Sequence, residues 1–242
     1  MKQGLFEIKE NRALTQTVYL MKLKGDTSCI TAPGQFVNVQ LDGLFLRRPI
    51  SVCDLNGEEL TLIYKVVGEG TAKMSAMTGG TLDLLTGLGN GYDTTKSGDA
   101  PLLIGGGVGV PPLYLLCKKL VEQGKKPTVI LGFNTKDEVF YEEEFLALGV
   151  NVYVTTVDGS YGTRGFVTNA MDDLSYTYVY TCGPEPMLRA VYHKSLSSGQ
   201  FSFEERMGCG FGACMGCSCK TRYGNKRICK DGPVLEKEEI IW

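Results

Sequence analysis

Residues 101–112 read PLLIGGGVGVPP, an apolar run followed by a cluster of glycines and a pair of prolines. The apolar run 101–104 predicts a strand, and Pro111 is typical of the first turn of a helix, here expected over 111–124. The turn between them holds Gly105, Gly106, Gly107 and Gly109. Their unhindered amides at the start of a helix suit a bound phosphate group. A turn kept only for packing is the alternative, because no third glycine completes the G-x-G-x-x-G fingerprint.

The alternation of strand and helix continues to about residue 200. Further strands are expected over 129–133, 152–157 and 178–181, and further helices over 141–148 and 186–196. Such alternation predicts a parallel sheet with crossover connections. Cys182, Gly183 and Pro184 follow the last strand, at the carboxyl edge of the sheet where ligands bind in open α/β folds. For Cys182, a small buried apolar residue is the alternative.

The first part of the chain has a different pattern, with short strands separated by turns. Strands are expected over 17–23, 35–41, 59–67 and 81–85. This spacing, with no helical stretch between the strands, predicts a small antiparallel barrel. The segment Arg47-Arg48-Pro49-Ile50-Ser51 lies at the end of a predicted strand, where an arginine can bind a pyrophosphate through two hydrogen bonds. Strand 59–67 runs into Gly68-Glu69-Gly70-Thr71, a turn whose N–H groups and hydroxyl also suit phosphate oxygens.

The carboxyl-terminal segment concentrates five of the nine cysteines. Cys209, Cys214 and Cys217 have the spacing C-x4-C-x2-C, and Cys229 follows. Plant-type ferredoxins hold a [2Fe–2S] cluster with this spacing, and glycines between the ligands let the loop approach the cluster closely. A zinc site is the alternative, although zinc more often takes paired C-x2-C ligands. Cys219 is either a spare thiol or a replacement ligand.

The composition excludes several classes of function. Lys and Arg number 25 against 27 Asp and Glu, a net charge of −2, so no overall charge favours nucleic acid. No apolar run reaches the roughly 18 residues of a membrane helix, and residues 1–16 lack the apolar block of a signal peptide. An odd number of cysteines argues against a disulfide framework. We expect a cytoplasmic protein that has neither a nucleic-acid nor a membrane partner.

In this order, the motifs resemble those of the ferredoxin-NADP reductase superfamily with an added cluster domain. More closely, the whole chain resembles the electron-transfer subunits of dihydroorotate dehydrogenase B. The resemblance implies an FAD-binding β-barrel over 1–98, an NAD-binding α/β domain over 99–200 and a small irregular [2Fe–2S] domain over 201–242. Ile50 departs from the superfamily, many members of which carry a stacking tyrosine at that position.

The resemblance also assigns residues to cofactors. FAD is expected to contact Arg48, Pro49, Ile50, Ser51, Ile63, Tyr64 and Lys65, with its pyrophosphate at Gly70 and Thr71. NAD is expected to contact Gly105, Gly106, Gly107, Gly109, Pro111, Cys182, Gly183 and Pro184. The expected metal ligands are Cys209, Cys214, Cys217 and Cys229. Ser51 and Cys182 are expected to act at the reactive edge of the flavin, where hydride transfer requires alignment rather than a general base.

The implied function follows from the number of electrons that each cofactor exchanges. NADH gives up two electrons as a hydride and an iron–sulfur cluster accepts one at a time, so a flavin has to connect them. We expect the chain to pass electrons between NAD(H), FAD, the cluster and the FMN of a dihydroorotate dehydrogenase catalytic subunit in pyrimidine (UMP) biosynthesis, as a heterotetramer of two of each chain. NAD is expected rather than NADP because no arginine pair is evident to hold a 2′-phosphate.

Two alternatives stay open. A subunit of a bifurcating ferredoxin:NADP reductase or of a hydrogenase diaphorase has the same modules, although in the bifurcating relatives one cluster ligand is often aspartate. A zinc-stapled nucleotide-binding module without redox activity has the same thiolates, because zinc also binds them well.

Overall fold

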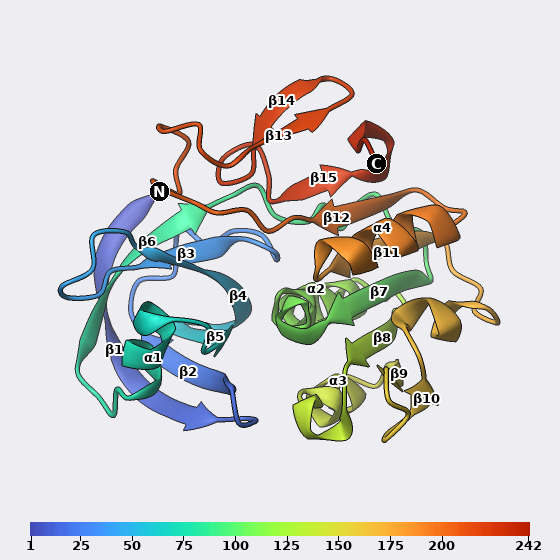
Figure 1. The fold of residues 1–242 in the computed structure, drawn as a ribbon, viewed down its shortest axis with the longest axis horizontal. Helices are drawn as coiled ribbons and strands as arrows, with labels where there is room; N and C mark the ends of the chain where they lie inside the picture. Colours follow the sequence, from blue (N-terminus) through green and yellow to red (C-terminus); the bar gives the residue numbers. More distant parts are fainter.

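Six antiparallel strands form a closed barrel in the order β1-β2-β5-β4-β3-β6, on the left of Figure 1. Their bounds in the computed structural model, which describes residues 1–242, are β1 Lys2–Ala13, β2 Val18–Lys24, β3 Phe36–Val39, β4 Arg48–Asn56, β5 Glu59–Lys65 and β6 Thr81–Leu88. Side chains alternate between the interior and the surface, as in β6, where Leu82, Leu84 and Leu88 are buried. The predicted antiparallel barrel is confirmed.

The barrel differs from the prediction in two strands and one helix. β1 and β4 are additional to the expected strands, and Arg48 begins β4 whereas a strand end was predicted there. That prediction is wrong because Pro49, which cannot donate a ladder hydrogen bond, is typical of strand ends rather than of strands. Helix α1 (Glu69–Ser75) occupies the expected Gly-x-Gly-Thr turn. Its seven residues are too few to show a helical period.

A seven-stranded sheet forms the second layer, in the order β10-β9-β8-β7-β11-β12-β15. Its strands are β7 Pro101–Gly106, β8 Thr128–Phe133, β9 Asn151–Thr156, β10 Thr163–Arg164, β11 Tyr178–Cys182, β12 Gly199–Ser202 and β15 Val234–Glu236. Neighbouring strands are parallel except for β12 and β15. The helices between them are α2 Pro111–Glu122, α3 Glu142–Ala147 and α4 Glu185–Lys194. The predicted parallel sheet is confirmed, and none of the helices is both long and apolar enough to cross a membrane.

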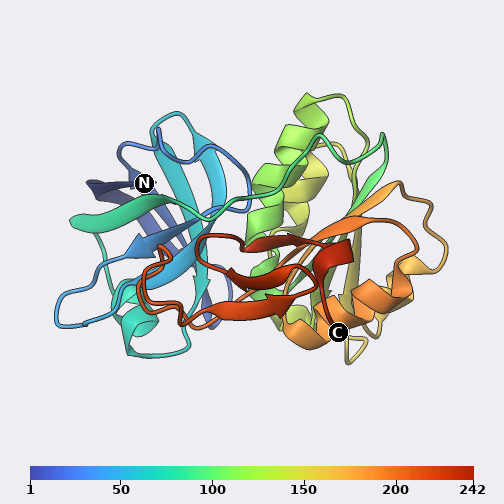
Figure 2. The same cartoon turned by 90° about the horizontal axis from the view of Figure 1, so that it is seen from above.

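The carboxyl-terminal segment is built onto the end of this sheet. It contains the hairpin β13 (Ser218–Thr221) and β14 (Gly224–Arg227), followed by β15, which pairs with β12, and by a short 3-10 helix over Lys237–Glu239. Figure 2 shows the segment, in red, lying across the seam between the barrel and the sheet. Strand β12 crosses residue 200, where we expect a domain boundary, so the two units share a strand at that point.

The barrel and the sheet are joined by a hydrophobic cluster to which both contribute. Cys53 and Ile63 of the barrel belong to the same buried cluster as Leu113 and Leu116 of α2, the helix between the two layers (Figure 1). At the edge of this contact, Lys118 of α2 forms an ion pair with Asp54 of β4 at 3.0 Å. Packing of this kind holds the carboxyl edge of the sheet beside the barrel, which is where the cavities described next are found.

Candidate functional site

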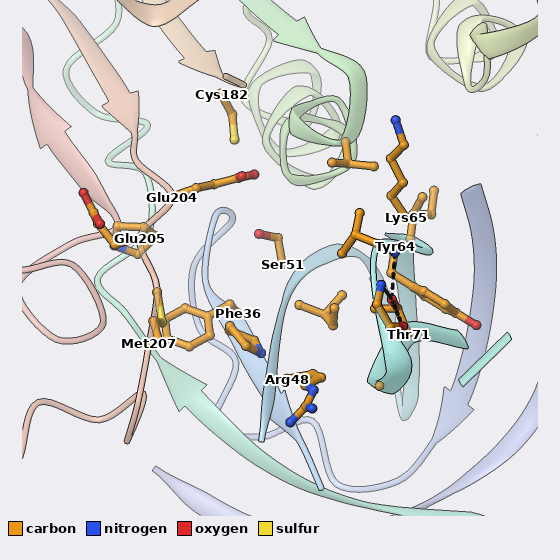
Figure 3. A pocket seen from close by; sticks show the side chains of 18 of the residues that line it. Phe36, Arg48, Ser51, Tyr64, Lys65, Thr71, Cys182, Glu204, Glu205 and Met207 are labelled. Atoms are coloured by element: carbon orange, nitrogen blue, oxygen red, sulfur yellow. Dashed lines mark hydrogen bonds between the residues drawn. The ribbon is translucent and has the colours of Figure 1, made fainter. Parts of the chain in front are cut away.

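The first cavity, of about 460 Å³, lies between the barrel and the carboxyl-terminal segment. All barrel residues expected to contact FAD line it, together with Cys182: Arg48, Pro49, Ile50, Ser51, Ile63, Tyr64, Lys65, Gly70 and Thr71. Figure 3 shows them on the walls of the cavity, with Arg48 at one end and Cys182 at the other. Tertiary folding therefore brings this expected set into one place, and the contact of each residue with FAD stays a prediction.

Arg48 and α1 form the end of the cavity suited to a pyrophosphate. Arg48 packs against Gly70 and donates a hydrogen bond to the carbonyl of Leu46. The Thr71 hydroxyl accepts a hydrogen bond from the Val67 amide at 2.9 Å and donates to the Gly68 carbonyl at 3.1 Å. The Thr71 hydroxyl therefore stabilises the start of α1, whereas its place in the sequence motif predicts a contact with phosphate. The first amides of α1, which have no intrahelical acceptor, and the Arg48 guanidinium are the groups available to an anion there.

Cys182 and Glu204 lie at the opposite end of the cavity, and Ser51 lies between them and Arg48 (Figure 3). Cys182 is only 2% exposed, and burial raises the pKa of its thiol, which is neutral at pH 7. Glu204 is exposed to solvent, and partial desolvation by the surrounding protein atoms raises the pKa of its carboxyl. Sequence reasoning missed Glu204, because it reaches Cys182 only through the parallel pairing of β11 with β12, in which Cys182 is opposite Ser202.

The second cavity, of about 540 Å³, lies at the carboxyl edge of the sheet. Five of the residues expected to bind NAD line it: Gly106, Gly107, Gly109, Gly183 and Pro184. Gly105, Pro111 and Cys182 do not line it: Gly105 packs against Val110, Pro111 is buried in the first turn of α2, and Cys182 lines the first cavity instead. A Cβ on Gly109 would lie 2.3 Å from the carbonyl oxygen of Cys182, so the two expected NAD segments pack directly against each other.

Several other residues of the second cavity carry no sequence motif. Phe166 lines it and is 65% exposed, which is unusual for an aromatic ring and leaves its face available to a ligand. Glu138 also lines it, and its carboxylate accepts hydrogen bonds from the Asn134 amide at 3.1 Å and the Asn134 side chain at 2.8 Å. Glu138 lies five residues beyond Phe133, the last residue of β8.

The two cavities meet at a common wall formed by Lys65, Val108 and Glu204. Lys65 is the last residue of β5, and Val108 lies in the glycine turn after β7. A dinucleotide in one cavity and a flavin in the other would therefore approach each other at this wall. Such an arrangement aligns two reacting groups without any catalytic acid or base.

The loop that carries Cys209, Cys214 and Cys217, called the cysteine loop below, lies beside the first cavity. Met207, which lines that cavity, is followed closely by Cys209. The amides of Ala213 and Cys214 donate to the Cys209 sulfur at 3.2 and 3.4 Å, and the Cys229 amide donates to the Cys217 sulfur at 3.4 Å. Burial opposes ionisation of Cys209. Hydrogen bonds with Phe211, Ala213 and Cys214 outweigh this effect and lower the pKa of the Cys209 thiol to about 6.

The four expected metal ligands lie as two pairs, Cys209 with Cys214 and Cys217 with Cys229. No three of these side chains are grouped so that they could hold a single metal ion in the structure. Amides directed at thiolate sulfurs are the contacts that tune iron–sulfur clusters, and the loop fits such a cluster in this respect. Cys219 is half-buried on β13, opposite Lys226 of β14.

A barrel joined to a parallel sheet, with adjoining cavities and a cysteine loop, defines a flavin-dependent reductase that has an iron–sulfur domain. Two family models match the chain. Residues 204–241 match the iron–sulfur cluster binding domain of dihydroorotate dehydrogenase B, and residues 103–193 match the oxidoreductase NAD-binding domain.

Relatives match over nearly the full length. The chain is 44% identical to the dihydroorotate dehydrogenase B (NAD(+)) electron transfer subunit of Bacillus pumilus, over 99% of this chain and 98% of the relative. It is 47% identical to the subunit of the same name from Fusobacterium nucleatum, over 96% of both chains. The chain belongs to the family of dihydroorotate dehydrogenase B electron transfer subunits, as the resemblance predicted.

Solved structures of reductases have the same fold. The structure of an NADH-dependent reduced ferredoxin-NADP oxidoreductase, described for flavin-based electron bifurcation, matches with a TM-score of 0.90 and 31% identity over 99% of this chain and 90% of that one. A ferredoxin NADP+ reductase from Neisseria gonorrhoeae has the same fold, with a TM-score of 0.71 and 16% identity over 80% of this chain and 90% of that one.

Proposed function

We propose that this chain passes electrons between NAD(H) and the FMN of a dihydroorotate dehydrogenase catalytic subunit, through FAD and a [2Fe–2S] cluster, in pyrimidine biosynthesis. When bound, the flavin accepts a hydride and releases electrons singly, and the cluster carries them one at a time. The observation that carries the proposal is the common wall of the two cavities at Lys65, Val108 and Glu204, with the cysteine loop next to the first cavity.

The residues of the chain have separate tasks in this function. The turn at Gly107 and Gly109 holds the dinucleotide, while Arg48 and the start of α1 hold the pyrophosphate of FAD. Cys182 supplies a neutral thiol at the wall of the first cavity, so no charge opposes the approach of a planar ring there. Glu204 lines both cavities, so its carboxyl borders the place where the two rings would meet.

The partner is expected to dock on the exposed side of the cysteine loop. Phe211 and Met215, on either side of Cys214, are 44% and 54% exposed. Met215 has a positive φ of 61°, a backbone conformation that non-glycine residues seldom adopt. Exposed apolar side chains beside an electron-carrying centre fit a protein interface. We propose a heterotetramer of two of each chain, located in the cytoplasm.

A visible spectrum tests the electron path. We expect the isolated protein to show flavin bands and thiolate-to-iron absorption, and both are expected to bleach when NADH is added without oxygen. Replacement of Cys214 by serine should remove the iron signals and leave the flavin bound and reducible. A colourless protein that contains one zinc ion would contradict the proposal, as would a flavin that NADH does not reduce.

A second candidate is a subunit of an electron-bifurcating reductase, which the 31% identical structure described above favours. Both candidate functions require the same FAD-binding, NAD-binding and iron–sulfur domains. The identity of the partner protein distinguishes them. Affinity purification of the tagged chain from its host is expected to recover an FMN-containing dehydrogenase. Recovery of a second, larger flavoprotein reductase would favour bifurcation.

A further inference from the structure

Asn38 is a buried amide between the barrel and the cysteine loop. It lies in β3 between Val37 and Val39, and its side chain is 2% exposed. Its Nδ2 donates a hydrogen bond to the carbonyl oxygen of Cys209 at 3.3 Å. The side chain therefore connects the flavin-binding barrel directly to the first expected ligand of the cluster, although it lines neither cavity.

This connection carries a cost in stability. The Oδ1 atom of Asn38 is buried and has no hydrogen-bond partner, a condition shared by only two other side-chain atoms, Thr155 Oγ1 and Trp242 Nε1. An unpaired amide oxygen in the interior is destabilising, and a leucine of similar size would avoid the loss. Rotation of the amide does not help, because its oxygen would then face the Cys209 carbonyl oxygen. A polar residue at this position is therefore better explained by a role than by packing.

The backbone of the cysteine loop leaves room for the Asn38 side-chain amide. Gly210, next to Cys209, has a φ of +77°, and a Cβ at this position would lie 1.9 Å from Asn38 Nδ2. The backbone of Asn38 is held as well, because its carbonyl accepts a hydrogen bond from Arg47 at 3.3 Å. Arg47 is in turn fixed by an ion pair with Asp83 at 2.8 Å. The Asn38 amide thus links β3 to the cysteine loop at Gly210, where the loop has no side chain.

The same strand and the same loop also form part of the flavin cavity. Phe36, two residues before Asn38, and Met207, two residues before Cys209, both line it (Figure 3). Across the β3–β4 ladder, Asn38 is paired with Pro49, another residue of that wall. The hydrogen bond therefore sets how the first cluster ligand is placed relative to the flavin cavity.

We propose that Asn38 is a positioning residue for electron passage between the flavin and the cluster, through its hydrogen bond to the Cys209 backbone. The proposal rests on the proposed function, since it requires both cofactors. It assigns to Asn38 no contact with a cofactor and no ligation of metal. Its effect is confined to the placement of the cysteine loop and to the electrostatic surroundings of the Cys209 thiolate.

The test compares Asn38→Leu and Asn38→Asp with a matched control in the holoprotein. Leucine removes the whole polar group, and aspartate keeps its shape but lacks the donor. The control is Gln40→Leu, which removes an amide that follows β3 and whose side chain bonds Leu44 and not the loop. For both Asn38 variants we expect the rate of flavin bleaching by NADH to stay within twofold of wild type, while the reduction of the cluster slows at least tenfold.

A spectroscopic measurement separates positioning from simple support. The electron paramagnetic resonance spectrum of the dithionite-reduced cluster should change in both Asn38 variants and remain unchanged in the Gln40 variant. Asn38→Leu should also be at least as resistant to thermal unfolding as wild type, because the unpaired oxygen is gone. If an Asn38 variant loses iron but keeps FAD, the loop depends on this hydrogen bond and the proposal is supported.

Three results would overturn the proposal. The first is an unchanged spectrum together with an unchanged rate of cluster reduction in both variants. The second is an equal slowing of the flavin and cluster steps, which would place the effect at the flavin. The third is loss of both FAD and iron, which would show general packing. A wild-type cluster that NADH fails to reduce would contradict the proposed function instead, and the dithionite spectra would still decide the role of Asn38.

Discussion

Replacement of Gly109 by alanine is expected to weaken NADH binding without affecting the flavin. A Cβ at this position would lie 2.3 Å from the carbonyl oxygen of Cys182, 2.4 Å from its carbonyl carbon and 2.6 Å from the Cα of Gly183. These are backbone atoms at the end of a central strand, so they cannot rotate away as a flexible side chain would. The two turns that line the second cavity must therefore separate.

The size of the effect follows from the cost of overpacking. An extra methyl group in a well-packed site costs about 1–3 kcal/mol. If this cost falls on the dinucleotide-binding conformation, affinity for NADH drops about 5- to 140-fold, since about 1.4 kcal/mol corresponds to a factor of ten. The KM for NADH, measured with an artificial electron acceptor, should rise by a factor within this range, and the FAD content should remain that of wild type.

A matched substitution controls for the loss of a glycine. Gly79→Ala adds the same methyl group where nothing lies within 4 Å of the new Cβ, and it should leave the KM unchanged. The reasoning is refuted if Gly109→Ala binds NADH as tightly as wild type. It is also refuted if the variant loses FAD in parallel, because the two turns would then support the whole fold rather than the dinucleotide cavity.

Three further perturbations have defined outcomes. Gly210→Ala should cost about 1–2 kcal/mol in backbone strain at a φ of +77° and push away the Asn38 amide, so that iron content falls while FAD is retained. Lys118→Met removes the ion pair to Asp54 between α2 and β4 and should lower the unfolding free energy by about 1 kcal/mol in urea denaturation; a double variant with Asp54→Asn should add little to this loss. Because partial desolvation raises the pKa of Glu204, the folded state holds its proton more tightly than the unfolded state. The unfolding free energy of wild type relative to Glu204→Gln should therefore fall as the pH rises from about 4 through the raised pKa, and a parallel pH dependence of the two proteins would contradict this assignment.

Much of the candidate site could be predicted because it depends on short segments. The spacing of Cys209, Cys214 and Cys217 is enough to predict them as cluster ligands, because a cluster requires thiolates at fixed separations along one loop. The glycine turn after β7 could also be predicted from the sequence, because the strand, the turn and the helix are neighbours in the chain. In contrast, the prediction failed at Arg48, where Pro49 is typical of a strand end although the segment begins a barrel strand.

Residues that act through strand pairing could not be predicted. Glu204 lies two residues beyond the end of β12, and the parallel pairing of β12 with β11, which places Ser202 opposite Cys182, brings it near that cysteine. Asn38 was equally hidden, since it lies 171 residues from Cys209 in the chain and carries no motif. Gly105 belongs to the expected turn but packs behind it, which depends on the direction of its backbone in β7.

The amino-acid sequence alone determined the kinds of chemistry available, namely four suitably spaced cysteines near the carboxyl terminus, two glycine-rich turns and an arginine-bearing segment of the barrel. Only the tertiary structure decided that the two cavities share a wall at Lys65, Val108 and Glu204, and that a barrel amide holds the cysteine loop. The physical reason is that local spacing fixes the geometry of one turn or loop, whereas the distance between two such segments depends on strand order, register and the packing of the barrel against α2.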